Sequence, residues 1–139
     1  MTDPQPGGDT GGAAGAGAAR IRAIYTGRGA AVPPAIETRI GLAELTGRMD
    51  ALEAVENVKR ALVAETALDP KTEQLIQFSQ LLVLGHTSIA EHHARAARRA
   101  GASLAELSSV AEHAVIAAGL PAYLQGMDIL GRIAQEAAG

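Results

Sequence analysis

The 139-residue chain contains no cysteine, no tryptophan and only three aromatic side chains, one phenylalanine and two tyrosines. Without cysteine it cannot form disulfides, supply a thiolate nucleophile, ligate an iron–sulfur cluster or use a CxxC redox pair. Because aromatic residues are scarce and alanine is abundant, helices are favoured over a β fold. The sequence therefore predicts an all-α protein without thiol chemistry.

The chain also lacks long apolar runs and an excess of positive charge. No run approaches the roughly 20 apolar residues of a membrane helix, and the formal net charge is -3. A chain of this charge has no general attraction for phosphate backbones or anionic membranes. We therefore expect a cytoplasmic protein that binds neither nucleic acid nor membrane. A core of small side chains buries little area, so homo-oligomerisation is expected.

Composition divides the chain into three predicted parts. Residues 1–19 are rich in glycine and alanine and, apart from Met1, hold no large apolar residue, which predicts a disordered tail. Residues 20–34 include a cluster of glycine and proline and are predicted to be a loosely ordered lead-in. Residues 35–139 are predicted to form one compact bundle of about six helices.

Apolar residues recur with helical period from residue 36 onward. Ile36, Ile40 and Leu45 predict a short amphipathic helix. A longer amphipathic helix is predicted by the apolar residues that follow, which are Met49, Leu52, Val55, Val58, Leu62 and Val63. Both predicted helices are amphipathic.

Capping signals divide the second half of the chain into four further helices. Asp69 before Pro70 predicts a helix start, and Thr87 or Ser88 is predicted to cap the next helix. Ser103 with Glu106 forms a capping box. The glycines and proline that end or begin these helices are Gly85, Gly101, Gly119 and Pro121.

Histidine is the residue type whose unperturbed pKa lies nearest neutrality, and the chain has four, at positions 86, 92, 93 and 113. At 100° per residue, His93 shares a helix side with Ala90 and Ala97, whereas His92 lies with Arg95. His93 is therefore predicted to point inward and His92 outward. An inward histidine is either a proton-transfer residue or an ordinary core histidine, and the sequence leaves both interpretations open.

A metal site formed by His86, His93, His113 and Glu112 is the other chemistry that these histidines suggest. Their spacing matches no zinc signature such as HExxH. We therefore predict no metal and no cofactor.

A series of short motifs resembles the carboxymuconolactone decarboxylase and alkylhydroperoxidase D-like superfamily over residues 68 to about 130. In chain order the motifs are Leu68-Asp69-Pro70-Lys71-Thr72, Leu75-Ile76, Leu84-Gly85, His93-Ala94-Arg95-Ala96-Ala97, Gly101, Glu106-Leu107 and Ala118-Gly119-Leu120-Pro121-Ala122. The resemblance implies a compact all-α subunit that assembles into a homotrimer or homohexamer. It also implies a pocket lined by the central helices near the subunit contacts.

The peroxidase branch of this superfamily has a glutamate, a CxxC pair and a histidine. In the gapless register those positions hold Gln74, His86, Ile89 and His93, so only the histidine is retained. A register shifted by one residue would instead place Glu73, Gly85, Ser88 and His92 there. The shifted register makes the histidine solvent-facing and breaks the match at Gly101, so the gapless register is preferred. Cysteine peroxidase activity is excluded in either register.

The decarboxylase branch carries a histidine at position 93 and commonly histidine or glutamine at position 113. The resemblance therefore implies His93 and His113 as catalytic residues, with His86, Gln74 and Arg95 as substrate-binding candidates. The expected function is cofactor-independent, lyase- or isomerase-like proton transfer on an unsaturated acid, lactone or polyketide-like small molecule, with or without decarboxylation. The branch's pocket aromatics are absent, which leaves the alternative of a non-catalytic oligomeric binding or scaffold protein.

Overall fold

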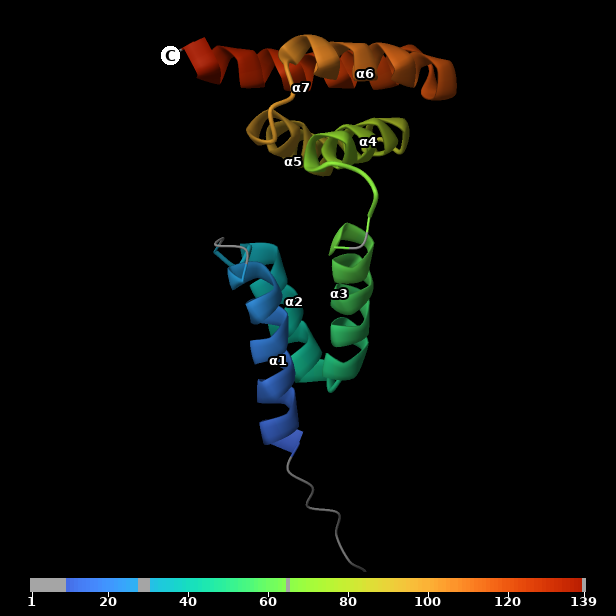
Figure 1. Ribbon diagram of the computed structural model, residues 1–139. Helices are drawn as coiled ribbons and strands as arrows, with labels where there is room; N and C mark the ends of the chain where they lie inside the picture. Colours follow the sequence, from blue (N-terminus) through green and yellow to red (C-terminus); the bar gives the residue numbers. More distant parts are fainter. Residues whose placement is uncertain (1–9, 28–30, 65, 139) are drawn as a thin grey trace, which may run out of the picture. The chain divides into compact units, whose positions relative to one another are not determined.

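The computed structural model describes residues 10–27, 31–64 and 66–138. Within these residues the chain is all-α, as predicted, with seven helices and no strand (Figure 1). The helices are α1 (Thr10–Thr26), α2 (Pro34–Thr46), α3 (Met49–Ala64), α4 (Pro70–Val83), α5 (Thr87–Arg99), α6 (Leu104–Ala118) and α7 (Leu120–Ala138).

The chain divides between Thr66 and Ala67 into two compact units, which differs from the single predicted domain over residues 35–139. The first unit contains α1, α2 and α3, and the second contains α4 to α7. Each unit has its own apolar core, because the helices of each bury their side chains against one another. Helical periodicity and capping signals predicted α2 to α7, but they carry no information on which helices share a core.

Helix α1 occupies part of the region for which a disordered tail was predicted. Residues 10–19 are helical, and residues 1–9 lie outside the described part of the chain. Two side chains of α1, Ala18 and Ile21, are buried against α2 and α3. A Cβ at Gly17 would lie 2.5 Å from Cγ of Met49, so this glycine permits α1 to approach α3 closely. The helix forms because alanine has a high helix propensity. It packs on α3 because Gly17 permits the close approach.

The predicted lead-in over residues 20–34 is also largely structured. Arg20 bonds to Glu53 of α3 through two nitrogens, and Arg22 bonds to Glu37 of α2 in the same bidentate manner. Residues 28–30 lie outside the described ranges, and Val32 packs against the core of the first unit. The arginines find carboxylate partners on helices that are distant in sequence, which composition alone does not reveal.

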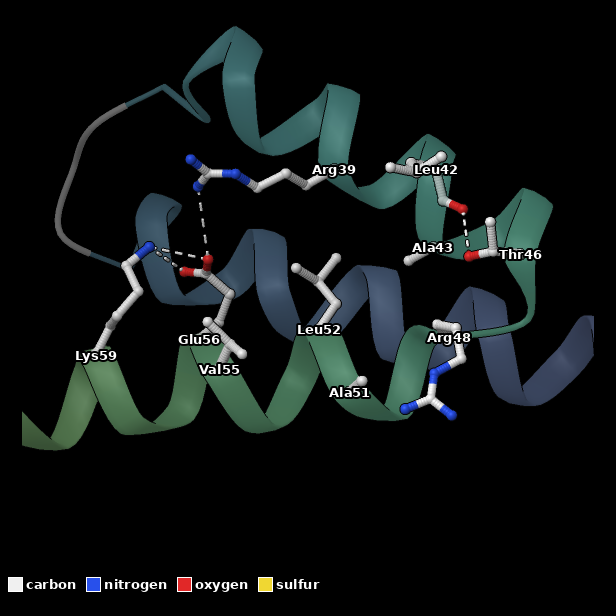
Figure 2. A pocket seen from close by; sticks show the side chains of 10 residues that line it. All are labelled: Arg39, Leu42, Ala43, Thr46, Arg48, Ala51, Leu52, Val55, Glu56 and Lys59. Atoms are coloured by element: carbon white, nitrogen blue, oxygen red, sulfur yellow. Dashed lines mark hydrogen bonds and ion pairs between the residues drawn. The ribbon is translucent and has the colours of Figure 1, made fainter. Parts of the chain in front are cut away.

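Glu56 of α3 is a buried carboxylate, only 2% exposed (Figure 2). The Tyr25 hydroxyl donates to its Oε2 at 2.6 Å, and Lys59 Nζ donates to both carboxylate oxygens at 2.8 and 2.9 Å. Burial opposes ionisation, but the hydrogen bonds from Lys59 and Tyr25 outweigh it, so the pKa of Glu56 lies below its usual range. The carboxylate is thus charged and fully paired at neutral pH.

The apolar faces predicted for α2 and α3 are only partly buried. Ile36 and Ile40 are in the core, as their spacing predicted, but Leu45 is 88% exposed. On α3 the stripe of Val55, Val58 and Leu62 is also exposed. Within the first unit α1 and α2 cover the side of α3 that carries Met49 and Glu56, and the rest of its apolar stripe is left exposed.

Most capping predictions for the second unit are confirmed. The Asp69 carboxylate accepts from the Thr72 backbone N–H at 3.0 Å, and Ser103 with Glu106 forms the full capping box. The cap predicted for α5 is wrong. His86 stands at its N-cap without a side-chain cap bond, and the Thr87 hydroxyl lies 3.4 Å from the Gln125 side-chain oxygen of α7 instead.

The second unit consists of two helix pairs, α4 with α5 and α6 with α7, stacked as two layers (Figure 1). Lys71 in the first turn of α4 forms an ion pair with Glu106 in the first turn of α6 at 2.8 Å. Helices α4 and α6 therefore begin at the same end of the second unit. The α4–α5 and α6–α7 connections therefore both lie at the opposite end, which we call the turn end. The core of this unit combines alanines with larger side chains, which are Phe78, Leu82, Leu107, Ile129, Leu130 and Ile133.

Gly126 of α7 fits against α6 so tightly that a substituent is expected to be destabilising. An added Cβ would lie 2.6 Å from the Ala111 Cβ and 3.1 Å from a Leu82 methyl, whereas one at Gly131 meets nothing within 4 Å. We expect Gly126→Ala to lower the free energy of unfolding by about 1–3 kcal/mol, as overpacking does. Gly131→Ala on the same helix should raise it by up to about 1 kcal/mol through helix propensity. Urea unfolding followed by circular dichroism measures the free energy of unfolding of both variants. Equal changes in the two variants would contradict the close packing at Gly126.

Candidate active site

His93 lies on α5 beside the stripe of alanines that this helix buries. Ala90, Ala94 and Ala97 are fully buried, and His93 is half-buried next to them. Its Nδ1 lies 2.8 Å from Oε1 of Gln74 on α4. Because an amide oxygen only accepts, Nδ1 donates the hydrogen of this bond. The neutral ring therefore keeps its lone pair on Nε2, the nitrogen a general base requires.

The surroundings of His93 hold its imidazole in the neutral form. Burial lowers the pKa of His93, and the neighbouring His92 lowers it further through like-charge repulsion. The two rings meet edge to face with their centroids 5.3 Å apart. His92 itself is exposed. The inward and outward orientations predicted from helical period are thus found in the structure.

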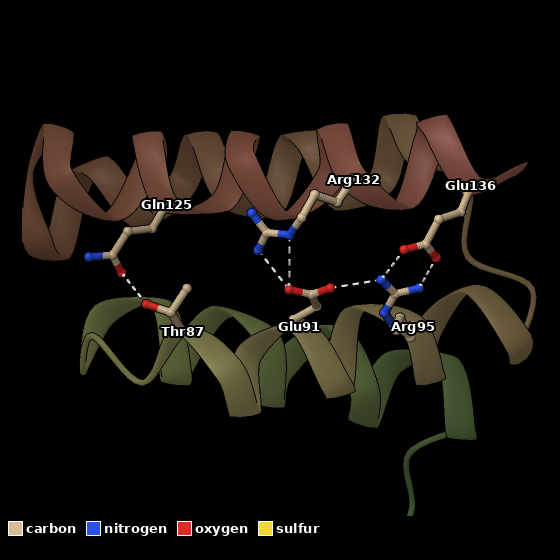
Figure 3. A network of polar contacts seen from close by, with 6 residues as sticks. All are labelled: Thr87, Glu91, Arg95, Gln125, Arg132 and Glu136. Atoms are coloured by element: carbon tan, nitrogen blue, oxygen red, sulfur yellow. Dashed lines mark hydrogen bonds and ion pairs between the residues drawn. The ribbon is translucent and has the colours of Figure 1, made fainter. Parts of the chain in front are cut away.

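Arg95, a predicted substrate-binding residue, is held in an ion-pair network between α5 and α7 (Figure 3). Its guanidinium bonds to Glu91 one turn earlier at 2.7 Å and to both carboxylate oxygens of Glu136. Arg132 approaches the same Glu91 at 2.6 Å. These carboxylates raise the pKa of Arg95 above its usual range. The geometry gives Arg95 the role of joining two helices, and its contact with substrate stays a prediction.

Glu91, Arg132 and Glu136 complete this network and are not among the site residues predicted from the sequence. A signal for them was present, since Glu91 stands four residues before Arg95 and Arg132 stands four residues before Glu136. Charged pairs at that spacing share one helix face. Their convergence across two helices follows only from the way in which α5 and α7 pack side by side.

The remaining site candidates are distributed over the second unit. Gln74 is half-buried and bonds to His93, which makes it a positioning residue for the imidazole. His86 is exposed at the start of α5, and His113 is exposed on α6. Within the described residues, no hydrogen bond or ring contact joins either histidine to His93. The structure thus brings together Gln74 and His93 but does not join His113 to them.

The part of the chain that the structure describes contains no group of three or more histidine, cysteine, aspartate or glutamate side chains placed to hold one metal ion. Likewise, within the described ranges no helix is long and apolar enough to cross a membrane.

In a comparison with protein-family models, the model of the carboxymuconolactone decarboxylase family matches residues 49–131, which is more than half of the chain. The chain belongs to the carboxymuconolactone decarboxylase family. This confirms the resemblance inferred from the motifs, and it extends the match toward the N-terminus to include α3. Searches of curated proteins and of solved structures return no match. The His93–Gln74 pair lies inside the region matched by the carboxymuconolactone decarboxylase family.

Proposed function

We propose that this protein is a cofactor-independent enzyme of the carboxymuconolactone decarboxylase family that transfers a proton on an unsaturated acid, lactone or polyketide-like small molecule. The observation that carries the proposal is the half-buried His93, held at Nδ1 by Gln74 with Nε2 left as a base. Lowering of the His93 pKa by burial keeps this base neutral near pH 7. Membership of the family is consistent with such chemistry.

The neutral state of His93 favours proton abstraction as the first step. In that step the substrate C–H bond breaks, the proton goes to Nε2, and the electron pair spreads into the conjugated carbonyl as a dienolate. Return of the proton to a different carbon completes an isomerisation. Decarboxylation would instead break the bond to the carboxylate carbon and release carbon dioxide. It would then require an imidazolium that protonates the dienolate, a form that the lowered pKa disfavours.

Deuterium exchange tests this proposal across a range of candidate substrates. A panel of α,β-unsaturated acids and five-membered unsaturated lactones is incubated with the protein in D₂O and followed by proton NMR. We expect protein-dependent loss of the signal of an acidic C–H position in at least one compound. If the folded protein accelerates exchange in none of them, the proton-transfer proposal is wrong.

The second candidate function is a non-catalytic binding protein. It is favoured by the ion pairs that Arg95 already makes with two carboxylates. An enzyme acting on an acid gains from a cation near the substrate carboxylate, but the guanidinium of Arg95 is already bound to Glu91 and Glu136. For this candidate the same NMR samples would show line broadening of a bound compound without deuterium exchange. The two candidates are therefore separated by one set of spectra.

We also propose that the protein assembles into a homotrimer or homohexamer. Large apolar side chains are exposed at the turn end of the second unit, among them Val83, Leu84, Ile89, Ile116 and Leu120. Contiguous exposed apolar surface is typical of interfaces. We expect light scattering at micromolar concentration to give the mass of three or six chains. A mass of one chain, about 14.2 kDa, would contradict this.

A further inference from the structure

A groove of about 480 Å³ lies between α2 and α3 in the first unit (Figure 2). The apolar part of its lining consists of Leu42, Ala43, Ala51, Leu52 and Val55. Leu42 is 60% exposed and Val55 is 56% exposed. Grooves that bind small molecules have volumes of roughly 300–1,000 Å³ and combine apolar walls with a few polar groups. The groove has the size and apolar lining of such a site.

The charges that line the groove are mainly positive. Arg39, Arg48 and Lys59 line it, and Glu56 is its one carboxylate. Lys59 is already hydrogen-bonded to Glu56, so these two charges compensate each other. Arg39 Nη1 lies 3.9 Å from Glu56 Oε1, too far for a hydrogen bond, and the Arg39 side chain is 54% exposed. The guanidinium of Arg39 therefore retains donors that can bind another anion.

We propose that this groove binds a small amphipathic carboxylate, such as a medium-chain fatty acid, with its carboxylate on Arg39 and its apolar body along Leu42 and Val55. A guanidinium fork matches a carboxylate in charge and shape. Figure 2 shows Arg39 and Lys59 at one end of the groove and Arg48 nearer the other, with the apolar side chains between them. A cation is disfavoured because both oxygens of Glu56 are already bonded. A purely polar anion would leave the apolar wall uncovered.

Titration of the full-length ¹⁵N-labelled chain with decanoate, kept below its micelle concentration, tests the proposal. We expect saturable amide shifts that are concentrated in α2 and α3. Decanol and decylamine have the same apolar body without a negative charge, and they should bind at least about tenfold more weakly, because a hydrogen bond between charged groups is lost. Equal binding of the three compounds, or shifts centred outside α2 and α3, would overturn the proposal.

Two matched variants locate the carboxylate. Arg39→Gln should weaken decanoate binding roughly tenfold, since it removes the charged donor. Arg60→Gln, on the same helix as Val55 but outside the groove lining, should change it by less than about twofold. Equal weakening by both would show a diffuse charge effect and contradict the assigned site. If the α2 and α3 amides respond to protein concentration and not to decanoate, the groove is an interface between copies and the proposal is wrong.

Discussion

Replacement of His93 by glutamine is expected to lower turnover by roughly 10²–10⁴, the usual contribution of a general acid or base. Glutamine retains much of the side-chain volume and can still bond to Gln74, but it has no nitrogen that accepts a proton at neutral pH. The loss should be in turnover, with a smaller effect on substrate binding. The measurement is the rate of deuterium exchange with a compound identified in the D₂O panel.

The neighbouring histidine is the matched control for this prediction. His92 is exposed and contacts the His93 ring only edge to face, so His92→Gln should change the rate by less than about threefold. Both variants must retain the oligomeric mass and thermal midpoint of the wild type. Unchanged turnover in a folded His93→Gln variant would make His93 a core histidine and favour the binding-protein interpretation.

Truncation of Phe78 to alanine is expected to lower the free energy of unfolding by about 3–5 kcal/mol. Phe78 is fully buried and is the only phenylalanine of the chain. Much of the surrounding core is alanine, whose side chains have no flexible end that could move into the space left behind. Because proteins are stable by only about 5–15 kcal/mol, the variant should unfold at much lower urea concentration than the wild type.

A conservative substitution at Phe78 shows how much of the loss in stability comes from the cavity that alanine leaves. Phe78→Leu keeps most of the apolar volume and should lower the free energy of unfolding by roughly 1–2 kcal/mol. Urea unfolding curves followed by circular dichroism give both values. If Phe78→Ala lowered the free energy of unfolding by less than about 1 kcal/mol, Phe78 would not be the centre of the core.

Local signals predicted the second unit more accurately than the first. Asp69 and the Ser103–Glu106 box act within one helical turn, and such short-range bonds can be read directly from sequence. Helix α1 was missed because its burial depends on Gly17 meeting Met49, a contact between residues 32 positions apart. The exposure of Leu45 was missed for the same reason, because periodicity identifies an apolar face but not the element that covers it.

The candidate site was predictable where it depends on one helix and unpredictable where it depends on contacts between helices. Helical period placed His93 inward, and the family register singled out Gln74, with which the structure shows a hydrogen bond. The role of Arg95 was not predictable from α5 alone, because Glu136 lies on α7. Likewise, whether His113 contacts His93 depends on how α6 packs, which the motifs do not encode.

The proposed function depends on Gln74 holding His93 as a neutral base, and a pH titration of the histidine side-chain ¹⁵N signals in the full chain tests this most directly. We expect His93 to show the tautomer with hydrogen on Nδ1 and a bare Nε2, because Nδ1 donates to Gln74. Its pKa should lie below the ordinary value of 6.5, because burial disfavours the imidazolium. Hydrogen on Nε2, or a pKa at or above 6.5, would contradict this role for His93.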